Sequence, residues 1–242
     1  MKELTYSIAA DVFARFPGYR RGVVIAHGVR NSASPAELIA MLRGEEAGAR
    51  EKLNAETLTA EPRLASWRDA FRMLGYKPGD FRPSVEALLR RVLRGQELPS
   101  INALVDIGNI VSLRHRLHVG GHAIDVLTQD IALRPASGGE EFIAFGTNEI
   151  EHPLAGEFIF VEGDRVLTRR WIWRQAKHSL TLPETTAVEI NIDALPPVTG
   201  PELENAARDV MALVARFCGG TLRFEVLGRD HPRITLGREG ES

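Results

Sequence analysis

The hydrophobic periodicity of the sequence changes at Gly120, and this change limits the possible folds more than any other feature. Before it, apolar residues recur at helical spacing in four segments, which predicts helices over 35–53, 62–74, 84–94 and 102–116. After it, short runs rich in β-branched and aromatic residues alternate with Gly and Pro, as in GEFIFVEGDRVLTRRWIW and TAVEINIDAL. Helices and strands that are segregated along a chain in this way are typical of the α+β class.

The two ends of the chain contain further strand and helix signals. An early strand over 22–29 follows a short helix and a turn at Pro17-Gly18, and a late helix over 201–217 precedes the strand TLRFEVLG. The segment FIFVEGDRVLTRR predicts a hairpin with Gly163 and Asp164 at its tip. Pairing of an early strand with the late one would join the two ends. We therefore expect a single domain over residues 1–242, with a mixed, mostly antiparallel sheet flanked by helices.

Composition excludes several classes of protein and function. Of the 242 residues, 44% are hydrophobic and 26% are charged, as in a globular protein with a sizeable core. The net charge of −2 gives no overall attraction to nucleic acid, so RNA contacts would need a local patch. One cysteine, Cys218, excludes an internal disulfide. No signal-like segment or membrane-length apolar run is evident, so we expect a cytoplasmic protein without membrane contact.

The segment 102–116 predicts a helix that is apolar on nearly every side, which is typical of a buried helix. Asn102, Asp106 and Asn109 fall on one face of it because they are four and three residues apart. Polar groups in a buried helix must find hydrogen-bond partners or face a cavity. Two interpretations of Asp106 and Asn109 follow: structural hydrogen bonds to a neighbouring loop, or the wall of a pocket.

The next segment contains Gly120, Gly121 and His122. It is either a loop whose amides approach a ligand or a plain turn before a strand. The series His115, His118 and His122 has spacings of three and four, but no matching Cys or acid cluster supports a metal site, and we predict none. No phosphate loop, nucleophile elbow or His-Glu-x-x-His motif is present, and no cofactor is expected. The serines Ser84 and Ser112 have no evident His/Asp partners, so nucleophilic catalysis lacks support.

The segment RRWIWRQAKHS mixes cations with two tryptophans. Such a mixture either stacks on single-stranded nucleic acid or forms one buried and one exposed face of a hairpin, and we favour the hairpin. Any RNA contact would use two groups of cations, which are Arg169, Arg170, Arg174 and Lys177 in this segment, and Arg90, Arg91 and Arg94 on the helix over 84–94.

The order of the motifs is more specific than any one of them. RPSVEALLRRVLRG, LPSINALVDIGNIVSL, GGHAID and RRWIWRQAKHSLTLPETTAVEI follow one another along the chain. This series resembles the B3/B4 domain, the editing module of the β subunit of bacterial phenylalanyl-tRNA synthetase, which also occurs as a free-standing protein. The resemblance covers about Val23 to Ile192. It implies a B3/B4-like fold and a pocket that hydrolyses the ester of a mischarged tRNA, with the aminoacylated 3′ end of tRNA as the partner.

The resemblance also implies site residues. Asn109 and His122 match pocket residues of the family and are the candidate catalytic groups, His122 to orient or deprotonate a water and Asn109 to hold the water or the amino acid. Candidate substrate-binding residues are Asp106, Gly120, Gly121, Arg174, Glu189 and Asn191. The chain departs from the family in having Gly108 before Asn109, bulky residues at 173–175, and Asn191 where the family has a glutamate, with Glu189 two residues away on the same strand face.

The function expected from the resemblance is deacylation of mischarged tRNA in trans. Motifs for ATP binding by a class II synthetase are missing, so ligation of amino acids to tRNA is not expected. One alternative is a non-catalytic module that binds tRNA or a small molecule in the same pocket. Another is a hydrolase or amidase that acts on a free aminoacyl ester or a related metabolite.

Overall fold

The structure is a computed structural model, and it describes residues 4–237. The α-helices are α1 (Ala10–Arg15), α2 (Ala36–Lys52), α3 (Pro62–Met73), α4 (Ser84–Leu93), α5 (Ala103–His115) and α6 (Gly200–Phe217). The strands are β1 (Thr5–Ile8), β2 (Arg20–His27), β3 (His118–Ala123), β4 (Ile131–Pro135), β5 (Phe142–Ile143), β6 (Ile150–Glu151), β7 (Phe158–Glu162), β8 (Arg165–Arg169), β9 (Arg174–Gln175), β10 (Ala187–Ala194), β11 (Thr221–Leu227) and β12 (Arg233–Thr235). The helices predicted from the sequence are confirmed, with ends within one or two residues.

The larger strands form two sheets. One has the order β11-β2-β10-β3 and is antiparallel throughout, and the other has the order β12-β1-β4-β7-β8-β9, in which β1 and β4 run parallel. The expected α+β class with mixed, mostly antiparallel sheets and flanking helices is confirmed. The expected pairing of an early and a late strand is confirmed by β2 and β11, in which Val24 lies opposite Phe224. The predicted hairpin is β7–β8, and it turns at Gly163, which has a φ of 53°.

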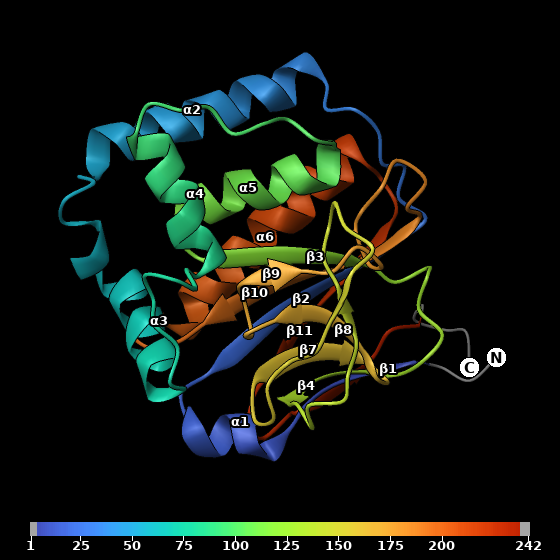
Figure 1. The fold of residues 1–242 in the computed structure, drawn as a ribbon. Coiled ribbons are helices and arrows are strands. Elements are labelled where there is room, and N and C mark those ends of the chain that lie inside the picture. The colour runs from blue at the N-terminus through green and yellow to red at the C-terminus, as the bar shows by residue number, and fades with distance from the viewer. Residues whose placement is uncertain (1–3, 238–242) are drawn as a thin grey trace.

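The two central strands of the four-stranded sheet, β2 and β10, are buried on both faces. Helices α4, α5 and α6 pack on one face, with α2 on the outer side of α5, and strands of the six-stranded sheet lie on the other face. Figure 1 shows α5 and α2 above β3, and β4 and β7 below it. Alternate residues of β2 follow this division, because Val24 and Ala26 belong to the helical core whereas Val23 and Ile25 belong to the core between the sheets. A side chain on either face of β10, or of the middle of β2, therefore lies inside the protein, whereas β11 is partly exposed.

Helix α5 connects the helical layer to β3. Its N-cap is Asn102, whose side-chain oxygen accepts a hydrogen bond from the Val105 N–H at 3.1 Å, and it ends at Arg116, which adopts the left-handed conformation with a φ of 53°. Its apolar side chains pack between α2, α6 and β3. The prediction that this helix is buried is confirmed.

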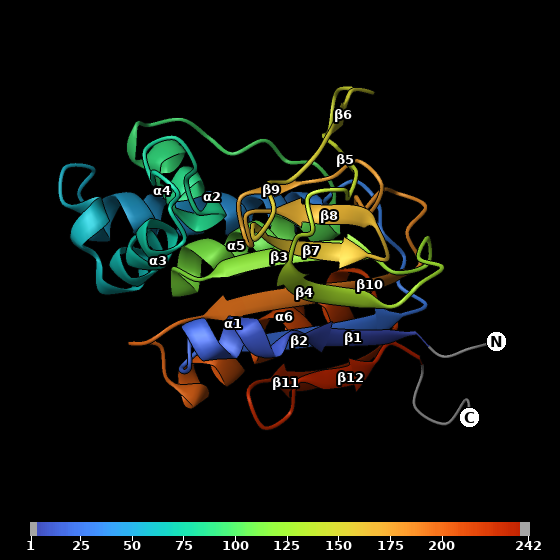
Figure 2. The ribbon, with the colours of Figure 1, turned by 60° about the horizontal axis from the view of Figure 1, so that its bottom comes forward.

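Strand β3 lies at the edge of its sheet, so one side of its backbone has no neighbouring strand within residues 4–237. Strand β9 and the segment that follows it cover part of this edge: the side chain of Gln175, the last residue of β9, donates to the Gly121 carbonyl at 2.8 Å, and the Ala123 N–H donates to the Ser179 carbonyl at 3.0 Å. Strands β5 and β6 form an arm that projects from the sheets (Figure 2). Among the helices of residues 4–237, none is both long and apolar enough to cross a membrane.

Candidate functional site

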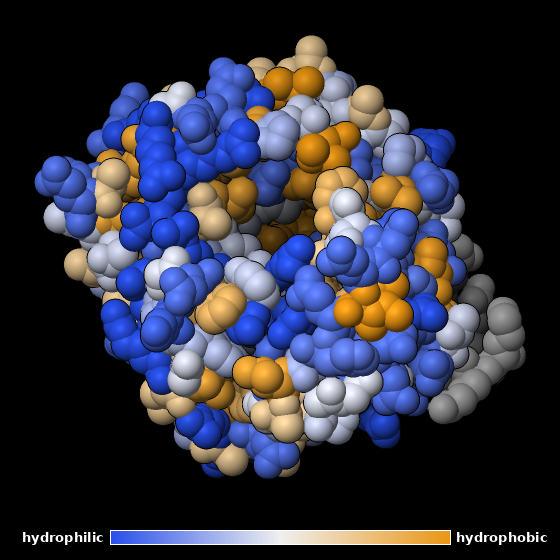
Figure 3. Space-filling view, in the orientation of Figure 1, coloured by the Kyte–Doolittle hydropathy of each residue, from blue (hydrophilic) through white to orange (hydrophobic). Residues whose placement is uncertain are grey.

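A cavity of about 430 Å³ lies where α5 approaches β3 and β10. Its wall is mostly aliphatic and aromatic, with Leu104, Val105, Val119, Phe145, Leu180, Leu182, Val188 and Ile190 among its residues. In the space-filling view a hollow opens near the centre of the molecule, with hydrophobic residues on its rim (Figure 3). We refer to this space as the apolar cavity. Its volume and lining suit an apolar group of small-molecule size.

A second cavity of about 310 Å³ lies on the other face of β3. Its wall contains Arg21, Ser84, His118, His122, Thr168, Arg174 and Asn191, and we refer to it as the polar cavity. The two cavities share Asn109, Val119, Gly120 and Gln175. Gly120 has no side chain, so the two spaces approach each other across the free edge of β3. The two glycines therefore belong to a strand edge between two cavities, rather than to a turn before a strand.

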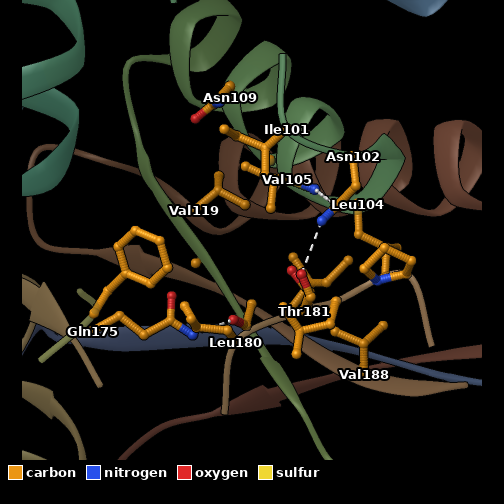
Figure 4. A pocket seen from close by; sticks show the side chains of 17 residues that line it. Ile101, Asn102, Leu104, Val105, Asn109, Val119, Gln175, Leu180, Thr181 and Val188 are labelled. Atoms are coloured by element: carbon orange, nitrogen blue, oxygen red, sulfur yellow. Dashed lines mark hydrogen bonds between the residues drawn. The ribbon is translucent and has the colours of Figure 1, made fainter. Parts of the chain in front are cut away.

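Asn109 is half-buried in the wall of both cavities. Its side-chain amide has no hydrogen-bond partner among the described residues. Asn102 differs, because its amide nitrogen donates to the Thr181 carbonyl at 2.9 Å and its oxygen caps α5. Figure 4 shows the two asparagines at different ends of the apolar cavity. The pocket-wall interpretation therefore holds for Asn109.

Asp106 does not share this environment, which corrects the expectation that it faces the substrate. Its carboxylate is fully buried and accepts hydrogen bonds from the Ser34 and Ser100 hydroxyls at 2.6 and 2.5 Å and from the Ile101 N–H at 3.1 Å. The reason is geometric, since two residues three apart on a helix differ by about 60° in direction. That difference turns Asp106 toward the 100–101 segment and leaves Asn109 at the cavity.

A stripe of polar side chains lies on the face of the four-stranded sheet that is turned toward the other sheet. Residues Glu189, Asn191 and Asp193 alternate along β10, and the pairing register places them opposite His122, Gly120 and His118 of β3. All five side chains are buried. A Cβ at Gly120 would lie 3.2 Å from the Asn191 side-chain oxygen and 3.4 Å from His118 Nε2, so the glycine makes room for both neighbours.

His122 and Glu189 form the first hydrogen-bonded group of this stripe. The Glu189 carboxylate lies 2.5 Å from His122 Nδ1 and also accepts from Asn191 Nδ2 at 3.0 Å. On the other side of the ring, Nε2 lies 2.9 Å from the Thr168 hydroxyl. With Nδ1 donating to the carboxylate, Nε2 is an acceptor and Thr168 donates to it. Hydrogen bonds therefore connect the Thr168 hydroxyl to the His122 imidazole, and the imidazole to the Glu189 carboxylate. Thr168 also lines the polar cavity.

Ser84, His118 and Asp193 form a second group of the same kind. The Ser84 hydroxyl is hydrogen-bonded to His118 Nδ1, and Nε2 of that ring lies 3.4 Å from Asp193 Oδ2. The other carboxylate oxygen of Asp193 is held by Arg21 Nε at 2.7 Å and by the Tyr19 hydroxyl. Burial lowers the pKa of His118 to about 4, so its imidazole is neutral at pH 7.

The sequence reasoning missed this second group. The pattern E-I-N-I-D in β10 was a usable signal, because polar residues at every second position share one face of a strand, and H-V-G-G-H repeats it in β3. Ser84 carried no comparable signal, because it reaches the stripe from the first turn of α4.

Two of the cations assigned to RNA contact lie inside the protein, which corrects their expected exposure. Arg169 is 4% exposed and holds the Glu157 carboxylate with two donors at 2.5 and 2.9 Å, and Arg170 lies against the Phe81 ring with its guanidinium carbon 3.7 Å from the ring centre. The prediction that buried and exposed side chains alternate along the segment RRWIWRQAKHS is also wrong. The backbone turns sharply here, with φ values of 46° at Arg170 and 67° at Trp171, and both side chains point inward.

The other cations lie nearer the surface. Arg174 is 41% exposed, lines the polar cavity and pairs with Glu151 at 3.0 Å, while Lys177 is exposed and donates to Asn148 at 3.0 Å. On α4, Arg90 pairs with the buried Glu86 at 2.8 Å. Arg91 and Arg94 are exposed, and Arg91 donates to the Glu97 carbonyl at 3.1 Å. Arg91, Arg94, Arg174 and Lys177 thus remain as surface cations.

The three histidines at 115, 118 and 122 point to different partners. His115 Nε2 lies 2.7 Å from Asp209, whereas His118 and His122 belong to the two groups of the polar stripe. Within residues 4–237, His, Cys, Asp and Glu side chains form no cluster of three or more that suits a metal ion.

Comparison with known proteins gives a family and a structural neighbour. The model of the B3/4 domain matches residues 66–219, which contain α4, α5, β3 and β10. A solved structure similar to this one is an N-terminal fragment of the phenylalanyl-tRNA synthetase β subunit from Pyrococcus horikoshii, with a TM-score of 0.48 and 12% sequence identity. The similarity covers 91% of this chain and 50% of that one, so the chain spans about half the length of the fragment. The search of curated proteins found no match.

Proposed function

The chain belongs to the B3/4 domain family, and from this membership and the two adjoining cavities we propose that it hydrolyses the ester bond of an aminoacyl-tRNA. The main support for the proposal is the environment of Asn109. Its amide lies in the wall of both cavities without a hydrogen-bond partner among the described residues. A half-buried amide that makes no hydrogen bond to these residues is suited to binding a ligand or a water.

The apolar cavity would accept the side chain of the amino acid. Val105, Val119 and Leu182 give it an aliphatic wall, which favours an apolar aminoacyl group. The ester carbonyl would then lie at the edge of β3, between the cavities. Arg174 at the polar cavity, with Arg91 and Arg94 as further surface cations, would contact phosphates of the tRNA, and such contacts weaken as salt increases.

The edge of β3 offers a donor for the developing oxyanion. In antiparallel pairing, alternate residues direct their backbone groups to the neighbouring strand. The Gly121 carbonyl bonds to the Gln175 side chain and the Ala123 N–H bonds to the Ser179 carbonyl, both on the side away from β10, so the Gly121 N–H also points away from β10. It has no acceptor among residues 4–237, and Gly121 lines the apolar cavity. A fixed backbone donor of this kind stabilises the charge that forms on a carbonyl oxygen.

The attacking water would be held by the Asn109 amide and activated through Thr168 and His122. The proton would pass from the water to Thr168 Oγ1 as the hydroxyl proton moves to His122 Nε2, and Glu189 at 2.5 Å would stabilise the imidazolium that results. Because the Thr168 hydroxyl already occupies Nε2, the water reaches the base through this hydroxyl rather than directly.

The test is a deacylation assay with tRNAs charged with different amino acids. The protein should hydrolyse tRNAs that are charged with apolar amino acids. Asn109→Ala and His122→Ala should each lower this turnover by roughly 10²-fold or more. Ser66→Ala is the control, because its hydroxyl donates to the Arg63 carbonyl within α3 and Ser66 is not among the residues that line the two cavities. Failure of every charged tRNA to be bound or hydrolysed would exclude the proposal.

One observation favours a non-catalytic binding module instead. Both nitrogens of His122 are engaged within the protein, and the side chain is 5% exposed, as is common for a structural histidine. In that case the cavities would bind the aminoacyl end without hydrolysing it. Equilibrium binding of a non-hydrolysable aminoacyl-tRNA analogue, combined with an absence of turnover of the ester, would select this function.

A further inference from the structure

Ser84 has the surroundings of a nucleophile. It lies in the first turn of α4, is half-buried, and forms part of the wall of the polar cavity. Its hydroxyl is hydrogen-bonded to His118 Nδ1, from a residue 34 positions away in the sequence. Thr168, the hydroxyl of the other group, is only 8% exposed. Of these two hydroxyls, Ser84 is therefore the more accessible to a substrate.

The protein fixes the tautomer that a serine nucleophile requires. Asp193 Oδ2 has no hydrogen-bond partner among the described residues and lies 3.4 Å from His118 Nε2, and a carboxylate at that distance favours the proton on Nε2. Nδ1 is then the acceptor, and the Ser84 hydroxyl donates to it. Arg21 and Tyr19 hold the other oxygen of Asp193, so the carboxylate cannot rotate away without breaking two hydrogen bonds.

From this geometry we infer that Ser84 is a catalytic nucleophile that accepts the acyl group of an activated ester, with His118 as its base and Asp193 as the residue that positions the ring. The arrangement of hydroxyl, imidazole and carboxylate is that of a serine hydrolase, although Nδ1 rather than Nε2 faces the serine. In the sequence Ser84 had no evident His/Asp partners, so nucleophilic catalysis lacked support. The structure provides these partners from β3 and β10 and corrects that interpretation.

The reaction has two halves. Ser84 Oγ forms a bond to the ester carbonyl carbon, its proton moves to His118 Nδ1, and the bond to the leaving alcohol breaks as that proton is transferred to the alcohol oxygen. A water then adds to the acyl-serine, gives its proton to His118 and releases the carboxylic acid, and the proton returns to Ser84 Oγ. The ester and one water are consumed, and one alcohol and one acid are formed.

This inference rests on the proposed function for its natural substrate, but its chemistry is tested without tRNA. A small alkyl fluorophosphonate reacts with activated serines by displacement of fluoride. The intact protein should gain one phosphonyl group, and tandem mass spectrometry of its peptides should place that group on Ser84. Modification of another residue, or no modification at concentrations that saturate a reference serine hydrolase, would overturn the inference.

Two variants test the roles of the partners. Ser84→Ala should abolish labelling, and His118→Asn should slow it by about 10²-fold or more, because the general base is lost. Ser66→Ala should label as the wild type does. Circular dichroism and thermal unfolding verify that each variant is folded. Equal labelling of wild type and folded His118→Asn would contradict the assignment, and mapping of the label in wild type remains decisive if that variant does not fold.

The outcomes separate this inference from the proposed function. Labelling of Ser84 without turnover of any aminoacyl-tRNA supports the nucleophile and excludes the proposed substrate. Full deacylation by Ser84→Ala supports the proposed function with direct attack by water and excludes the covalent route. Labelling together with loss of deacylation in Ser84→Ala supports both.

Discussion

Asn102 and Asn109 lie about two turns apart on the same helix, yet their side chains have different surroundings. Asn102 caps α5 and donates to the Thr181 carbonyl, whereas Asn109 bonds to no described residue. A buried hydrogen-bond partner left unpaired costs about 1–3 kcal/mol, and loss of an N-cap about 1 kcal/mol. At the residue scale, the sequence pattern alone gives these two asparagines the same interpretation, and their contacts distinguish them.

The first prediction compares the two asparagines. Asn102→Ala should lower the free energy of unfolding by about 1–3 kcal/mol, because it removes both hydrogen bonds. Asn109→Ala should leave this free energy unchanged within about 0.5 kcal/mol, as for substitutions away from buried contacts, and should reduce deacylation or ligand binding. Urea unfolding and the deacylation assay measure the two effects. A large loss of stability in Asn109→Ala, with unchanged activity per folded molecule, would assign Asn109 a structural role.

At the scale of elements, α5 and β3 together define the apolar cavity. Gly108 lies on the side of α5 that faces β3, and a Cβ built on it would be 3.9 Å from Val119 Cγ1, which is an ordinary contact. A glycine inside a helix is less stable than an alanine by about 0.5–1 kcal/mol. Gly108 lines the apolar cavity, so the missing side chain leaves room in the cavity and lowers the stability of α5.

The second prediction follows from these two effects of Gly108. Gly108→Ala should raise the melting temperature by a few degrees, roughly 2–4 °C per kcal/mol, and should raise the KM for an apolar aminoacyl ester, because the added methyl narrows the cavity. Gly44→Ala in α2 is the matched control: a Cβ there would have no atom of the described residues within 4 Å, so stability should rise without an effect on KM. An unchanged KM in Gly108→Ala would show that substrate does not occupy this part of the cavity.

For the whole molecule, the main consequence of the architecture is a polar stripe enclosed between two sheets. Burial lowers the pKa of His118 to about 4, Asp193 opposes this shift, and Arg21 and His122 add to it. Tyr19 also faces this group through its bond to Asp193. In the unfolded chain a histidine titrates near 6.5. Between these two values the unfolded chain binds a proton that the folded protein does not bind.

The third prediction is a pH dependence of stability. The contribution of neutral His118 is fully present above pH 6.5, and it is lost as the pH falls from 6.5 to 4, by on the order of 3 kcal/mol at about 1.4 kcal/mol per pH unit. The free energy of unfolding should therefore decrease over this range by more in wild type than in His118→Asn. Urea unfolding at several pH values measures the difference between them. Parallel curves for the two proteins would mean that His118 is not held neutral.

Local sequence patterns were sufficient to predict the main helices and strands and the fold class. Helical periodicity in α2 to α5, alternation in β10 and the Gly163 turn are local properties, set by backbone geometry and by the spacing of apolar residues over a few positions. The near-continuous apolar surface of α5 likewise predicted its burial. The order of motifs indicated the family that the comparison supports.

Which polar groups lie next to one another could not be predicted from the sequence, because it depends on how distant segments pack. In the sequence of β10 polar and apolar residues alternate, which is typical of a strand with one side exposed to solvent. In the fold the polar side is buried, because the second sheet covers it. Ser84, His118 and Asp193 come from three elements, and Arg169 is buried because Glu157 neutralises it across the β7–β8 hairpin. Periodicity specifies which side a residue occupies on its own element. What that side faces depends on contacts between distant segments, and those contacts set charge, burial and reactivity.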